Sequence, residues 1–197
     1  MKNIFKSILV AIIIIGGFSS CTDSDLSIDT LYNEVDTTGA ALRILDYPED
    51  IINVTGGSFD NCLCFLVEVQ EGDGSFTPNF SEVRVYISIF DDQDTEIPTT
   101  DLEGNEFGNI LYQTIPNASF AELSPINGLP MYQISIPTVD MVAAFPGADF
   151  NTPSFIVTSF ELQMTDGRVW SATNAGSTLS GPYFESPFTY KTIFLNI

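Results

Sequence analysis

Apolar and polar residues alternate in short runs along most of this chain, which predicts β-strands. The clearest run is 83–90 (VRVYISIF), where Val83, Val85, Ile87 and Ile89 take every second position. A period of two places such residues on one face of a half-buried strand. Similar runs rich in β-branched and aromatic residues predict further strands at 40–45, 51–54, 62–70, 109–115, 131–137, 155–164, 168–173 and 188–196.

Turn residues separate these runs, and helical periodicity is nearly absent. Asp166-Gly167 between two strand patterns predicts a hairpin with a type I′ turn. Residues 138–145 (TVDMVAAF) predict a single short helix with Thr138 as its N-cap, ended by Pro146-Gly147. Many short strands without alternating helices predict an all-β fold: a single antiparallel β-sandwich of Ig-like or fibronectin-III-like architecture.

The first residues of the chain have a different pattern. Lys2 and Lys6 precede the apolar run 8–15 (ILVAIIII), which Gly16 and Gly17 end. This run is too short to cross a bilayer, which takes about 20 apolar residues. A basic start, a short apolar run and small residues are typical of a secretory signal peptide.

The residues that close this segment are Phe18, Ser19, Ser20 and Cys21, and they resemble the bacterial lipobox. The resemblance implies removal of a lipoprotein signal peptide, 1–20, and acylation of Cys21 by palmitate-type chains. Two or more acyl chains anchor a protein stably to a membrane. The alternatives are an ordinary signal peptide with a chance cysteine, or a signal anchor. We expect a tether over 21–38 and the β-sandwich domain over 39–197.

An acidic, serine-containing stretch follows Cys21: Thr22, Asp23, Ser24, Asp25 and Asp29. It resembles the surface-export signal of Bacteroidota lipoproteins. The resemblance implies an outer-membrane protein that faces outward. A solvated acidic tether is the alternative.

Charge and composition narrow the classes of function. The chain has a net charge of −20, which disfavours nucleic acid and anionic lipid headgroups as partners. Its 44% apolar and 12% aromatic content is typical of a folded domain rather than a disordered one. It has no histidine, which excludes Ser-His-Asp and Cys-His catalysis and histidine-dependent metal sites.

Cys62 and Cys64 lie two apart in a predicted strand and so point to the same face. A disulfide at this spacing is expected to be strained in a regular strand. We therefore expect two buried free thiols that pack as small apolar residues, rather than a disulfide or a metal site.

Residues 91–108 form a long acidic loop. Asp91, Asp92, Asp94 and Glu96 offer several oxygens close together, which makes them a candidate calcium site. The spacing is not that of an EF-hand. We favour a solvated acidic loop, with no cofactor.

Two other candidate sites depend on residue types alone. Several aromatic residues lie late in the chain: Trp170, Tyr183, Phe184, Phe188 and Tyr190. The alternatives for them are an exposed platform for sugar rings and packing in the core. Their strand spacing favours the core. Paired carboxylates can hydrolyse glycosides, but with 26 acidic residues no pair is singled out.

Several segments together are similar to a family of uncharacterised Bacteroidota lipoproteins encoded beside SusC/SusD-type uptake systems. They are 39–43 (GAALR), 65–70 (FLVEVQ), 83–91 (VRVYISIFD), 165–168 (TDGR) with Ser171-Ala172, and 181–190 (GPYFESPFTY). The resemblance implies a non-catalytic, lipid-anchored surface protein of an outer-membrane nutrient uptake complex. It would bind glycan, peptide or the TonB-dependent receptor, or act as a scaffold. The alternatives are a small lipid-anchored carboxylate hydrolase and a structural or adhesion component of the envelope.

Overall fold

A computed structural model of the chain describes residues 39–53, 61–91, 98–148, 150, 154–175, 179 and 188–195. They belong to one compact unit, Thr37–Ile197. The expected signal peptide, Cys21 and the tether lie outside the described residues. Within the described ranges, no helix has the length and apolar character needed to span a membrane.

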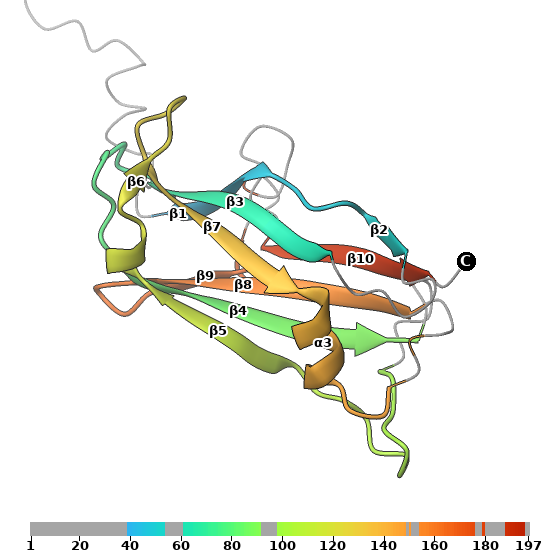
Figure 1. Cartoon of the computed structure of the whole chain (residues 1–197). Helices are drawn as coiled ribbons and strands as arrows, with labels where there is room; N and C mark the ends of the chain where they lie inside the picture. Colours follow the sequence, from blue (N-terminus) through green and yellow to red (C-terminus); the bar gives the residue numbers. More distant parts are fainter. Residues whose placement is uncertain are drawn as a thin grey trace, which may run out of the picture. The chain divides into compact units, whose positions relative to one another are not determined.

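The first of two sheets has four antiparallel strands (Figure 1). Their order is β1 (Ala40–Asp46), β3 (Cys62–Glu71), β7 (Pro130–Pro137) and β6 (Glu122–Leu123). The central strand β3 has a period of two: Leu63, Phe65, Val67 and Val69 are fully buried in the core. The even-numbered residues from Cys62 to Gln70 therefore lie on the face turned away from the core.

The second sheet has six strands, in the order β2 (Ile51–Asn53), β10 (Thr189–Leu195), β8 (Ser154–Met164), β4 (Phe80–Phe90) and β5 (Ile110–Pro116), with β9 (Val169–Ser171) also paired to β8. The pairs are antiparallel except β2 with β10, which is parallel. The expected purely antiparallel arrangement is therefore wrong at this edge. Strands β2 and β10 are far apart in sequence, so no tight turn forces them to run in opposite directions.

Aromatic and β-branched side chains join the two sheets. Phe65 of β3 packs edge-on against Phe160 of β8, with ring centroids 5.2 Å apart. The alternating residues Val83, Val85 and Ile87 of β4 are fully buried in the same core. The chain is thus mostly β, as the alternating pattern predicted.

One α-helix, α3 (Thr138–Ala144), follows β7 directly in the described part of the chain (Figure 1). The N-cap is Pro137 and not Thr138 as expected. The Thr138 hydroxyl instead donates to the Asn61 carbonyl at 2.6 Å, just before β3. Because Thr138 is buried, its hydroxyl needs a hydrogen-bond partner, and that partner is the Asn61 carbonyl rather than a backbone group at the helix end.

The hairpin predicted at 165–168 is present and joins β8 to β9. Its turn is not type I′, because positive φ occurs at Gly167 (91°) and not at Asp166. Gly167 N–H donates to the Met164 carbonyl at 3.1 Å, and Met164 N–H donates to the Arg168 carbonyl at 2.9 Å. This is a three-residue loop with glycine in the left-handed conformation after the turn.

The expectation of two free thiols is also wrong. Cys62 and Cys64 form a disulfide with their Cα atoms 5.4 Å apart, which lies within the usual disulfide range. Both are half-buried, on the face of β3 turned away from the core, so they do not pack as core residues.

Candidate ligand-binding site

The late aromatic residues do not form an exposed platform where the structure describes them. Phe188 is buried in the core, and Trp170 is partly buried and packs against the core cluster. The Tyr190 hydroxyl donates to the Pro48 carbonyl at 2.8 Å and to the Asp50 carboxylate. Tyr183 and Phe184 lie outside the described residues.

The candidate calcium residues are described only in part. Asp91 is exposed, whereas Asp92, Asp94 and Glu96 lie outside the described residues. In the part of the chain that is described, no three cysteine or acidic side chains gather as a metal site.

Later in the same loop, one carboxylate organises a turn. Asp101 Oδ1 accepts the N–H groups of Glu103 and Asn105, each at 2.9 Å. The Asn105 side chain donates to Asp101 Oδ2, and these bonds lower the pKa of Asp101. Asp101 therefore acts as a turn-forming residue.

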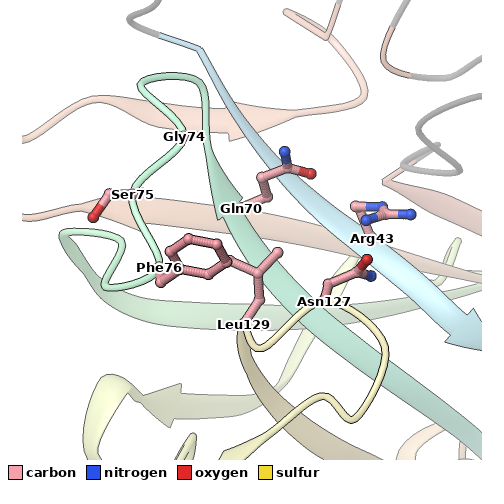
Figure 2. A pocket seen from close by; sticks show the side chains of 7 residues that line it. All are labelled: Arg43, Gln70, Gly74, Ser75, Phe76, Asn127 and Leu129. Carbon is pink, nitrogen blue, oxygen red and sulfur yellow. The ribbon is translucent and has the colours of Figure 1, made fainter.

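A small hollow lies on the outer face of the first sheet (Figure 2). Its volume is about 220 Å³. Strands β1 and β3, the β3–β4 loop and the β6–β7 loop contribute its lining: Arg43, Gln70, Gly74, Ser75, Phe76, Asn127 and Leu129. It combines an aromatic ring with one cation and two amides.

Beneath the hollow lies a buried acid that sequence analysis did not single out. Glu68 of β3 is fully buried and stands directly opposite Arg43 of β1. Glu68 Oε1 accepts two charge-assisted bonds, from Arg43 Nη1 at 2.8 Å and from Asn127 Nδ2 at 2.7 Å. The two donors both line the hollow, so Glu68 ties them together.

The β6–β7 loop brings Asn127 to Glu68. Ser124 Oγ accepts the N–H of Ile126 and of Asn127, both at 3.4 Å. Gly128 follows with φ of 69°, a conformation that favours glycine, and its N–H donates to the Ser124 carbonyl at 2.8 Å. This tight turn positions the Asn127 side chain to donate to Glu68.

The β3–β4 loop presents Phe76 to solvent. Asp73 Oδ1 accepts the Ser75 N–H at 2.8 Å, and Ser75 Oγ accepts the Thr77 N–H at 3.1 Å. These local bonds fix the turn that carries Phe76. The ring is 67% exposed, an unusual position for a phenylalanine, and it forms one wall of the hollow (Figure 2).

The lining of the hollow mixes polar and apolar groups. The seven lining residues comprise one cation, two amides, one hydroxyl, a glycine and two apolar side chains. It offers hydrogen-bond donors and acceptors beside an apolar ring. Comparisons of the chain with protein-family models, with curated proteins and with solved structures found no match.

Proposed function

We propose that this chain is a non-catalytic binding module, anchored by lipid on Cys21 to the outer face of the outer membrane, that captures a nutrient ligand for an uptake receptor. The observation that carries the binding role is the hollow, which sets the exposed ring of Phe76 beside Arg43, Gln70 and Asn127. Small-ligand sites combine an apolar wall with a few placed polar groups in this way.

The anchor and its location depend on the N-terminal sequence. The basic start, the run 8–15 and the lipobox-like residues that end in Cys21 support lipidation and export. The acidic residues after Cys21 support surface display. The similarity to lipoproteins encoded beside SusC/SusD-type systems supports a TonB-dependent receptor as the partner.

We infer that the two sheets form a β-sandwich of Ig-like architecture. The contact between Phe65 and Phe160 supports this, because the inner faces of both sheets then share one core. The hollow lies on the outer face of the first sheet, which is turned away from this core. The hollow gives no support to the alternative of a hydrolase that uses paired carboxylates, because none of its lining residues is acidic.

Co-purification tests this function. The full chain, with its own signal and a C-terminal tag, is purified from detergent-solubilised outer membrane and its partners are identified by mass spectrometry. We expect a TonB-dependent barrel to accompany it. The Cys21→Ser variant, which cannot be acylated, serves as the control and should leave the membrane fraction. A lipidated protein that purifies alone would contradict the receptor role.

A further inference from the structure

We propose that the hollow binds one ring of a neutral saccharide, and that Glu68 sets this preference by neutralising Arg43. The inference rests on the proposed binding function and adds the ligand class. It is carried by two bonds to Glu68, from Arg43 and from Asn127, since both donors share the lining of the hollow with the exposed Phe76.

The charge of the hollow favours a neutral ligand. An unpaired arginine in a binding site would attract carboxylates or phosphates, which its guanidinium can bind through two parallel bonds. Here the guanidinium already donates to a fully buried carboxylate at 2.8 Å. The pair has no net charge, and the whole chain carries −20. An anionic ligand would therefore gain little from Arg43 and would meet a repulsive field.

The lining offers both hydrogen-bond donors and hydrogen-bond acceptors to a ligand. Glu68 accepts a bond from Asn127 Nδ2, which fixes the orientation of that amide and leaves Asn127 Oδ1 as an acceptor. Gln70 adds one amide group that both donates and accepts. Hydroxyl groups donate and accept as well, so a polyhydroxylated ligand matches this mixed set.

The apolar wall and the volume of the hollow both suit a single sugar ring. Phe76 and Leu129 offer apolar surface to the C–H face of a sugar ring. Drug-sized ligands occupy pockets of about 300–1,000 Å³. A hollow of about 220 Å³ is smaller, which suits a single ring, with the rest of a glycan outside it.

The test measures binding to the full, lipidated protein in detergent by saturation-transfer NMR and calorimetry. The probes are matched pairs: glucose with glucuronate, galactose with galacturonate, and mannose with mannuronate. We expect the neutral member of at least one pair to bind at least tenfold more tightly than its uronate. Phe76→Ala should weaken that binding at least tenfold. Val139→Ala, also an exposed apolar residue but on α3, should leave it unchanged.

Two further variants isolate the role of Glu68 as a positioning residue. Glu68→Gln keeps the size of the side chain but leaves the charge of Arg43 uncompensated, so the preference should move at least tenfold toward the uronate. The double variant Arg43→Gln/Glu68→Gln removes both charges and should restore the neutral preference. A folding defect alone would weaken both members of a pair equally.

Each outcome has one meaning. If uronates bind as tightly as neutral sugars, or if Glu68→Gln leaves the preference unchanged, the inference is wrong and the binding function stands. If no sugar binds while the receptor still co-purifies, the inference is wrong and the receptor role stands. If neutral sugars bind and no receptor co-purifies, the inference stands and the receptor role is wrong.

Discussion

Arg43 Nη1 lies 2.8 Å from Glu68 Oε1 across the β1–β3 pair, and the Glu68 side chain has no exposed surface. This is a salt bridge on the outer face of a sheet, where charged side chains are usually solvated. Asn127 of the β6–β7 loop also donates to Glu68, which links the β1–β3 salt bridge to two residues that line the hollow.

Removal of Glu68 should destabilise the fold. In Glu68→Ala, Arg43 keeps its charge in a largely buried position without its partner, which costs about 2–3 kcal/mol once its 23% exposure is allowed for. Urea unfolding followed by circular dichroism measures this loss. The more accessible pair Arg84–Glu82, whose side chains are both half-buried, is the control, and Glu82→Ala should cost less than Glu68→Ala. Equal losses at the two sites would contradict the burial of Glu68.

The contact between Phe65 and Phe160 should be a main link between the sheets. Phe65→Ala should lower the free energy of unfolding by about 3–5 kcal/mol, because it removes a fully buried ring from a packed core. Phe76→Ala removes an exposed ring and should change stability by less than about 0.5 kcal/mol. Thermal and urea unfolding compare the two. Similar losses would contradict the shared core.

Tyr112 gives a prediction for alkaline pH. Burial first, and then the Asp140 carboxylate that accepts from its hydroxyl at 3.0 Å, raise the pKa of Tyr112 to about 12. An unfolded tyrosine has a pKa of about 10. The stability linked to Tyr112 is therefore fully present below pH of about 10 and is lost as the pH rises toward 12.

Absorbance at the tyrosinate band during alkaline titration measures this pKa. Tyr112→Phe identifies the step that belongs to Tyr112. Asp140→Asn should bring the pKa down without restoring its ordinary value, since burial is the larger cause. Ionisation of Tyr112 near its ordinary pKa in the folded protein would contradict the described contact.

The disulfide between Cys62 and Cys64 should protect both cysteines from alkylation and should add little to the free energy of unfolding. Alkylation of the denatured protein without reductant should leave Cys62 and Cys64 unmodified, and reduction should expose both. The two cysteines enclose a single residue, so loop closure contributes only about 1.5 kcal/mol in the chain-entropy account. The Cys62→Ser/Cys64→Ser variant should lose about that much or less. Alkylation of both thiols without reductant would contradict the disulfide.

The sequence predicted the strands well where the period of two was long. In β4 and β8 the buried positions alternate over 82–90 and 156–164, so burial and side-chain direction agree there. Strand β6 has only two residues and was not expected. The parallel pairing of β2 with β10 depends on contacts across more than a hundred residues, which local pattern does not contain.

The hollow could not have been predicted in the same way. Phe76 and Asn127 lie in two loops whose approach depends on the folded sheets, and Glu68 looks like one of many acids in the sequence. Glu68 stands between the apolar residues Val67 and Val69, which is the ordinary pattern of an outward-facing polar residue, so no signal in the sequence points to its burial. The resemblance to a lipoprotein family did not assign any of these residues.

The retention of a labelled neutral oligosaccharide by intact bacteria tests the central claim most directly. The full chain is expressed in a species that exports lipoproteins to its surface, and equal display is verified with an antibody to a C-terminal tag. Cells that display the unaltered chain should retain the ligand. Cells that display Phe76→Ala, or that express Cys21→Ser, should not. Equal retention by the unaltered chain and by Phe76→Ala would contradict the account.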